Sequence, residues 1–198
     1  MAAAISALAD RSPQEIVRCA GVTLCEGNPG DGALLSLSFL GRPTDVGWPG
    51  GEVVAEEGAP LKHAEALLVL HYLAQGDGAP MADRWVAFRE LPDALAYGHA
   101  FAGRVEPPLV SLFGADLDAF SRASEVLGGV PLSFGDASYA FNALPRVGLA
   151  VVLYLGDDEF PPAVNVLYDA AAGHYLPTED LAILGGIFVG RLIKASYT

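Results

Sequence analysis

Lysine is scarce in this chain. The 198 residues include only two lysines, Lys62 and Lys194. Lysine and arginine together number 11 and aspartate and glutamate 24, which gives a formal net charge of −13. A surface of this sign repels the phosphate backbone of nucleic acids and anionic lipid headgroups. We therefore expect neither nucleic acid nor a membrane surface among the partners of this protein.

Cysteine is scarce as well. Cys19 and Cys25 are the only two cysteines, and they lack the C-x-x-C spacing. A structural zinc site or an iron–sulfur cluster needs four ligands, which two cysteines cannot supply alone. In the reducing cytoplasm thiols stay unpaired, so we expect two free buried thiols in preference to a disulfide.

Long apolar runs are missing, although 52% of the residues are hydrophobic. Runs such as residues 149–155 fall far short of the roughly 20 residues of a membrane-spanning helix. The apolar residues 1–10 lack the basic start of a secretory signal. We expect a cytoplasmic protein in which residues 1–11 form a mobile or docked N-terminal segment and residues 12–198 form a single domain.

Known catalytic motifs are missing too. The sequence contains no Walker lysine motif, no G-x-S-x-G elbow, no H-E-x-x-H pair and no kinase signature. The glycines at 27, 30 and 32 precede a predicted strand, whereas a dinucleotide fingerprint requires a helix there. These absences lower the expectation of an enzyme without abolishing it.

The N-terminal part of the chain predicts a helix followed by a hairpin. Ser12-Pro13-Gln14-Glu15 has the spacing of a capping box with proline at the first helical position, which predicts a helix over residues 13–20. Two β-prone runs, residues 22–26 and 33–40, flank a loop rich in glycine and predict a pair of antiparallel strands.

The next segments are more varied. Residues 41–59 are rich in glycine and proline, which favours an irregular loop with one short strand at residues 51–55. Leucines on most of its surface predict a buried helix over residues 61–74. Residues 84–91 are typical of a strand and residues 93–102 of a short helix.

The last part of the chain predicts a helix, three strands and a helix. Pro107 and Pro108 are expected to break the chain before Asp116 caps a helix. Thr178 is expected to cap the final helix. Between these helices lie three β-prone runs at hairpin spacing, residues 137–143, 147–155 and 163–169. The pattern predicts an α+β fold, with a mainly antiparallel sheet (a C-terminal meander plus the N-terminal hairpin) covered by helices.

An acidic trio, Asp157-Asp158-Glu159, has two interpretations. Clustered carboxylates bind divalent cations or take part in acid–base chemistry, which makes the trio a weak candidate for a metal or substrate site. The trio also lies between two predicted strands, where Gly-Asp-Asp is ordinary turn chemistry. Both interpretations remain open at this point.

Four histidines occur in the sequence. His63 and His71 lie eight residues apart on a predicted helix, about 80° around its axis, so they diverge, unlike the i, i+4 pair of a zinc helix. A packed or surface histidine is the ordinary interpretation. A haem or corrinoid needs only one axial histidine, however, and His71 is the candidate for that ligand.

The segment Trp85 to Pro92 (WVAFRELP) combines aromatic and charged residues. On a strand, Trp85 and Arg89 would share one face and Phe88 the other. A buried Arg89 needs a carboxylate partner such as Glu90 or the acidic trio. The alternative is that Arg89 recognises an anionic group of a ligand or substrate.

Several of these segments together resemble DUF3786, an uncharacterised family of anaerobic bacteria and archaea. The resemblance covers about residues 12–195 and is carried by these residues: 68–73 (LVLHYL), 85–92 (WVAFRELP), Tyr97, Phe101, 144–146 (LPR), 156–162 (GDDEFPP) and 176–181 (LPTEDL). Some similar proteins carry an N-terminal four-cysteine module like that of corrinoid iron–sulfur proteins, which this chain lacks. The resemblance implies a role in anaerobic one-carbon or corrinoid metabolism.

These observations lead to three expectations about function. The first is a non-enzymatic cofactor-binding protein, with a cobamide or similar tetrapyrrole as the most specific ligand, His71 as its axial ligand and a cleft wall made of six residues: Trp85, Phe88, Arg89, Tyr97, Phe101 and Tyr139. The second is a small enzyme that uses Arg89 and the acidic trio. The third is an accessory protein that docks on a redox enzyme, with an iron–sulfur or corrinoid protein as its partner.

Overall fold

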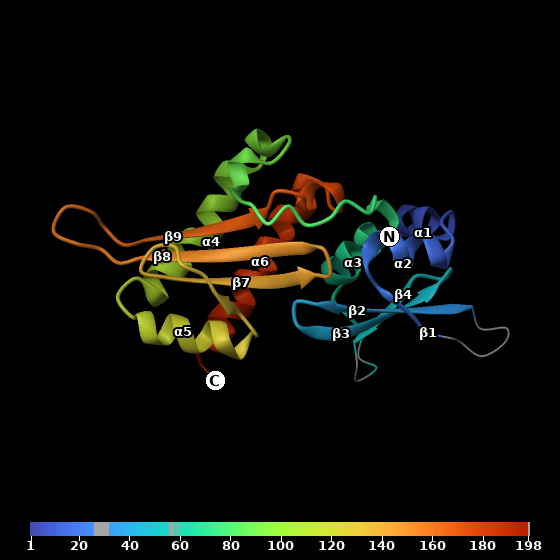
Figure 1. The fold of residues 1–198 in the computed structure, drawn as a ribbon, viewed down its shortest axis with the longest axis horizontal. Helices are drawn as coiled ribbons and strands as arrows, with labels where there is room; N and C mark the ends of the chain where they lie inside the picture. Colours follow the sequence, from blue (N-terminus) through green and yellow to red (C-terminus); the bar gives the residue numbers. More distant parts are fainter. Residues whose placement is uncertain (26–31, 56–57, 59, 198) are drawn as a thin grey trace.

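Two antiparallel sheets with helices packed on them form the fold of the computed structural model, which describes residues 1–25, 32–55, 58 and 60–197 (Figure 1). The first sheet has the order β1-β2-β3-β4, from β1 (Thr23–Cys25), β2 (Ala33–Phe39), β3 (Arg42–Trp48) and β4 (Glu52–Ala55). The second has the order β5-β9-β8-β7-β6, from β5 (Trp85–Ala87), β6 (Val130–Pro131), β7 (Ala137–Leu144), β8 (Val147–Tyr154) and β9 (Ala163–Asp169). The predicted α+β class is confirmed.

Three helices accompany the first sheet: α1 (Ala2–Ala9), α2 (Pro13–Ala20) and α3 (His63–Gln75). The helix predicted from the capping box is confirmed, because the Ser12 hydroxyl accepts a hydrogen bond from Glu15 N at 3.3 Å. The segment before it, residues 1–11, contains α1, whose Leu8 is fully buried. The predicted buried helix is α3.

The predicted hairpin forms, with β1 and β2 antiparallel and Leu24 opposite Leu35. The prediction for residues 41–59 was partly wrong, because β3 occupies residues 42–48 as a full strand between β2 and β4. Its proline and glycine weaken the local signal for a strand, and pairing on both sides outweighs that signal. Residues 56, 57 and 59 of this segment lie outside the described residues.

Two predictions near the middle of the chain were wrong. The strand predicted over residues 84–91 ends at Ala87, where the Glu90 carboxylate accepts a hydrogen bond from Ala87 N at 2.8 Å and a 3₁₀ turn, η1 (Phe88–Glu90), begins. Pro107 and Pro108 lie inside the helix α4 (Gly98–Phe113) instead of breaking the chain. The buried residues of α4 pack on α6 and β9, and that packing offsets the roughly 3 kcal/mol that each proline costs.

The C-terminal part follows the predicted meander. β7, β8 and β9 pair in sequence order, and only the last residue of β8 is exposed. The helices α4, α5 (Leu117–Val126) and α6 (Thr178–Ala195) pack against one another and against this sheet. Asp116 caps α5 as predicted, by accepting a hydrogen bond from Ala119 N at 2.8 Å. Thr178 is the first residue of α6, and Pro177 is its N-cap.

The two sheets meet where β2 ends beside β7. Leu40, directly after β2, donates a hydrogen bond from N to Ala143 O at 2.8 Å. One hydrophobic cluster includes residues of both sheets, such as Leu35 and Leu149. Cys19 is buried and Cys25 half-buried, and both are free thiols, as expected. In the part of the chain that the structure describes, no helix has both the length and the apolar character that a membrane span requires.

Candidate functional site

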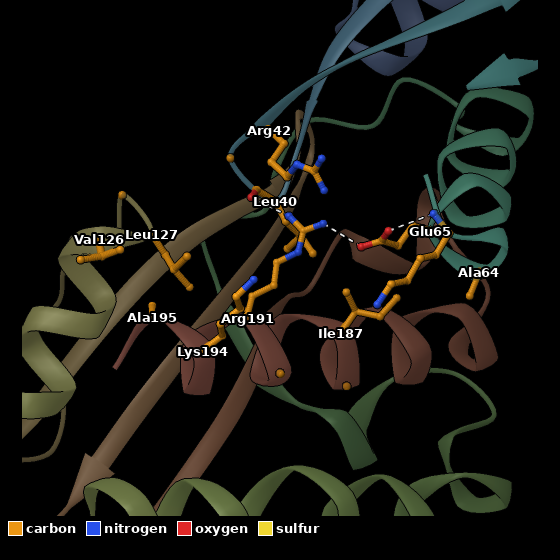
Figure 2. A pocket seen from close by; sticks show the side chains of 15 residues that line it. Leu40, Arg42, Ala64, Glu65, Val126, Leu127, Ile187, Arg191, Lys194 and Ala195 are labelled. Carbon is orange, nitrogen blue, oxygen red and sulfur yellow. Dashed lines mark hydrogen bonds and ion pairs between the residues drawn. The ribbon is translucent and has the colours of Figure 1, made fainter. Parts of the chain in front are cut away.

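A groove of about 1200 Å³ lies at the junction of the two sheets (Figure 2). Four elements line it: the β2–β3 turn (Leu40, Gly41, Arg42), the start of α3 (Lys62, Ala64, Glu65), the end of α5 with the turn after it (Val126, Leu127, Gly128) and the outer face of α6 (Gly186, Ile187, Gly190, Arg191, Lys194, Ala195). We refer to these residues as the cationic groove.

Cationic side chains dominate its charge. Both lysines of the sequence, Lys62 and Lys194, line the groove, together with Arg42 and Arg191. Glu65 is the only carboxylate among the lining residues. In a chain with a net charge of −13, four cations against one anion make this groove a local exception to the sign of the whole protein. Such a site attracts anions and concentrates them.

Arg191 is held in place by several contacts. Its Nη2 donates to the Glu65 carboxylate at 2.8 Å, and its Nη1 donates to Leu40 O at 3.1 Å. The guanidinium also lies over the Phe39 ring, 5.3 Å from the centroid. Arg191 therefore forms a fixed part of the groove wall, in the position that Figure 2 shows between Glu65 and Leu40.

Glu65 stays ionised in this position. Burial raises the pKa of its carboxyl group, but the hydrogen bond and charge of Arg191, the Lys62 backbone N–H and the charge of Arg42 together bring the pKa below the ordinary value. The Lys62 N–H donates to Glu65 at 3.2 Å and so caps the start of α3. Glu65 neutralises Arg191 and leaves the charges of the other three cations available.

Arg42, Lys62 and Lys194 are those three cations. All three are exposed, and within residues 1–25, 32–55, 58 and 60–197 their side chains make no ion pair and no hydrogen bond. An anion that binds them displaces no ion pair or side-chain hydrogen bond of the described residues. This is the property that a binding site requires and that a structural ion pair lacks.

Bare helix backbone forms part of the groove. Gly186 and Gly190 lie four residues apart on α6, hence on one face, and a Cβ atom at either position would meet nothing within 4 Å. Glycine inside a helix costs roughly 1 kcal/mol relative to alanine. Packing does not require glycine at these two positions, and their small size lets a ligand approach the helix closely.

A smaller cavity of about 190 Å³ adjoins the groove. We call it the side pocket. It shares five residues with the groove, Leu40, Gly41, Leu127, Gly128 and Arg191, and adds four of its own, Ser38, Phe141, Asn142 and Phe188. The shared residues show that the two cavities lie side by side.

The residues predicted to form a cofactor wall lie elsewhere. Phe88 and Phe101 are buried and stack with their ring centroids 4.2 Å apart, and both pack against Tyr168. Tyr139 packs edge-on against Phe120. It lies on β7, near the edge of the second sheet that is opposite to β5. The structure thus brings Phe88 and Phe101 together inside the hydrophobic core and keeps Tyr139 apart from them.

The remaining predicted residues are also separate. Trp85 and Tyr97 are half-buried, and Arg89 is exposed in η1. The prediction of a buried Arg89 ion pair was wrong, because Glu90 turns back to cap η1. His71 Nδ1 lies 2.6 Å from the Asp180 carboxylate, at the contact of α3 with α6. None of the seven predicted cofactor-binding residues lines the groove or the side pocket.

The acidic trio lies in the exposed loop between β8 and β9. Asp157 Oδ1 accepts hydrogen bonds from Phe160 N at 2.7 Å and from Glu159 N at 2.8 Å, and these bonds lower the pKa of its carboxyl group. The turn interpretation accounts for this geometry. Throughout the described ranges, no three histidine, cysteine, aspartate or glutamate side chains gather in a way that would hold a metal ion.

Sequence reasoning missed the groove, although one signal was available. The only two lysines of the chain both belong to the groove, and their rarity makes each of them worth placing. Nothing in the sequence pattern, however, brings the start of α3 beside the end of α6.

Comparison with known proteins identifies a family without a known activity. Neither a curated protein nor a solved structure matches the chain. The family model described as domain of unknown function (DUF3786) matches residues 12–191. This match confirms the resemblance noted in the sequence. The chain belongs to the DUF3786 family.

Proposed function

We propose that this protein is a non-enzymatic binding protein that holds an anionic small-molecule cofactor in the cationic groove. One observation carries the proposal: both lysines of a strongly acidic chain line the same cavity, and neither is engaged by a carboxylate of the described residues. Exposed cations spread over an acidic surface would serve solubility. Cations gathered in one cavity serve recognition.

The geometry supports binding by several weak contacts at once. Arg42, Lys62 and Lys194 come from three different elements, so a single ligand can be contacted from three directions. The first turn of α3 adds the positive end of its helix dipole, which favours negative charge. A volume of about 1200 Å³ suits a ligand as large as a cofactor.

A cobamide is the specific cofactor that we propose. Two points support it: the likeness of some related proteins to corrinoid iron–sulfur proteins, and the phosphodiester of the cobamide nucleotide loop, which offers an anionic group to the groove cations. His71 does not line the groove. We therefore propose binding without coordination of the cobalt by His71.

Isothermal titration calorimetry with cyanocobalamin tests the cobamide proposal, and orthophosphate tests the anion site itself. We expect heat of binding for both ligands, and a loss of at least tenfold in affinity for the double variant Lys62→Ala/Lys194→Ala. The control is Arg84→Ala/Arg122→Ala, which removes the same charge from two exposed arginines outside the groove.

Two results would contradict the proposal. If neither orthophosphate nor cyanocobalamin gives heat of binding, the groove is not an anion site. If both double variants weaken binding equally, net charge and not the groove causes the effect. A visible spectrum of bound cobalamin that changes in a His71→Ala variant would place the cobamide at His71 instead.

A further inference from the structure

The side pocket adjoins the cationic groove and reaches the buried rings of Phe141 and Phe188. Leu40 and Leu127 line both cavities. Gly41 also lines both, and Arg42 follows it directly in the β2–β3 turn. A ligand group bound by Arg42 in the groove is therefore next to the mouth of the side pocket.

Apolar side chains form one part of the wall of the side pocket. Phe141 and Phe188 are buried, with ring centroids 4.7 Å apart, and Leu40 and Leu127 complete the apolar part. The polar wall residues are Ser38 and Asn142, which are exposed, and Arg191. An apolar group placed against the two rings and the two leucines gains contact on several sides.

Arg191 keeps the two cavities chemically distinct. Its guanidinium is already bound by Glu65 and Leu40 O, so it does not need a ligand to satisfy it. It is fixed at the boundary that both cavities share. An anionic group therefore meets the unengaged cations in the groove, and the part of the ligand beyond that boundary meets aromatic rings.

From this arrangement we infer that the ligand is a phosphate ester carrying a short apolar group beside the phosphate, with the phosphate in the groove and the apolar group in the side pocket. The inference rests on the proposed function, because it takes the groove to be the anion site, and it does not depend on the ligand being a cobamide. Phosphate suits three separate cations, since its oxygens accept hydrogen bonds in several directions. The side pocket, at about 190 Å³, has room for about six water-sized groups.

A series of alkyl phosphates tests the inference by calorimetry. Methyl, butyl and hexyl phosphate present the same headgroup with apolar chains of increasing length. Each methylene that enters an apolar pocket raises affinity about fourfold. We expect butyl phosphate to bind at least tenfold more tightly than methyl phosphate, and hexyl phosphate to add little once the pocket is full.

Blocking the side pocket should abolish this gain without abolishing phosphate binding. Ser38→Trp fills the side pocket from an exposed position on β2 that does not line the groove, and Leu95→Trp adds the same side chain at a fully exposed position as the matched control. Asn142→Trp, at an exposed position on β7 that also lies outside the groove, replaces Ser38→Trp if circular dichroism shows that variant to be misfolded. In either blocking variant, methyl and butyl phosphate should bind equally well.

The outcomes separate this inference from the proposed function. Two results would overturn the inference and leave the groove as an anion site. The first is equal affinity for methyl and butyl phosphate in the unmodified protein. The second is an increase in affinity with chain length that persists in the blocking variants. Absence of binding by every phosphate probe would overturn both. If the lysine double variant binds the alkyl phosphates unchanged, the groove is not the anion site, and both the proposed function and the placement of the phosphate in the groove are refuted.

Discussion

Replacing Glu65 should destabilise the protein by disconnecting α3 from α6. The Glu65 carboxylate accepts from Arg191 Nη2 at 2.8 Å and from Lys62 N at 3.2 Å, so one side chain joins the start of α3 to the end of α6. The variant Glu65→Ala removes both contacts. Arg191 then keeps its hydrogen bond to Leu40 O at 3.1 Å but loses its ionic partner.

The expected cost follows from the burial of this pair. Breaking a fully buried ion pair costs about 3–5 kcal/mol, and an exposed pair contributes about 0–1 kcal/mol. Here the exposed fractions of the side chains are 18% for Arg191 and 11% for Glu65, so the pair is closer to a buried pair than to an exposed one. We expect Glu65→Ala to lower the free energy of unfolding by about 2–3 kcal/mol, and Glu65→Gln by about 1–2 kcal/mol because an amide oxygen still accepts a hydrogen bond.

The pH dependence of this difference has a definite sign. The pKa of Glu65 lies below its ordinary value in the folded protein. The ionised pair therefore stabilises the fold fully above the pKa of the unfolded state, and this contribution is lost as the pH falls through the folded-state pKa. The difference in the free energy of unfolding between the unmodified protein and Glu65→Gln should be constant near neutral pH. It should shrink as the pH falls below 4.5, the ordinary pKa of a glutamate side chain.

Urea denaturation followed by circular dichroism measures these differences. The control is Glu15→Ala, which breaks the i, i+4 pair of Arg11 and Glu15 at 3.0 Å. Because the Glu15 side chain is 42% exposed, this change should cost less than about 1 kcal/mol. Equal effects of the two alanine variants would refute the role given to Glu65. So would a gap to Glu65→Gln that widens as the pH falls.

Three further predictions concern adjacent glycines, a core aromatic and the groove. Gly185→Ala should destabilise the protein by about 1–3 kcal/mol in urea denaturation, because the new Cβ would collide with Tyr168 Oη and Phe101. Gly186→Ala should stabilise the protein by about 0.5–1 kcal/mol, because its Cβ meets open space. Phe88→Ala should cost about 3–5 kcal/mol by emptying a stacked core position, and orthophosphate affinity should not change in the protein that remains folded. Gly190→Ala should weaken orthophosphate or alkyl phosphate binding by calorimetry while slightly raising stability, because its methyl group would enter the groove.

Local patterns were sufficient where the chemistry is local. The capping box of α2 and the Asp116 cap of α5 form as their spacing predicts, because the donor and the acceptor are three residues apart. The antiparallel meander follows from three β-prone runs joined by a tight turn at residues 145–146 and a loop at residues 155–162. The acidic trio forms a turn for the same reason, since the Asp157 carboxylate reaches backbone N–H groups two and three residues ahead.

Local patterns failed where tertiary contacts outweigh propensity. The prolines of α4 predicted a break, yet α4 is held by packing on β9 and α6, which lie far away in the sequence. β3 was missed because glycine and proline weaken its local signal, yet it is held by pairing on both sides with β2 and β4. The aromatic residues near position 88 were predicted to form the wall of a ligand cleft, whereas Phe88 and Phe101 are buried in the core. Periodicity reveals that a residue is buried but not what covers it, and here Phe101 and Tyr168 cover Phe88 where an open cleft had been predicted.

The amino-acid sequence by itself determined the α+β class, the main helices and strands and the family, because these depend on short-range spacing and on residue types along the chain. Only the tertiary structure decided where the candidate site lies. Lys62 and Lys194 belong to helices that are distant in the sequence, and they line one cavity because α3 and α6 pack together at the junction of the two sheets. Charge composition is a property of the whole chain, whereas a local excess of positive charge depends on which surfaces the fold brings together.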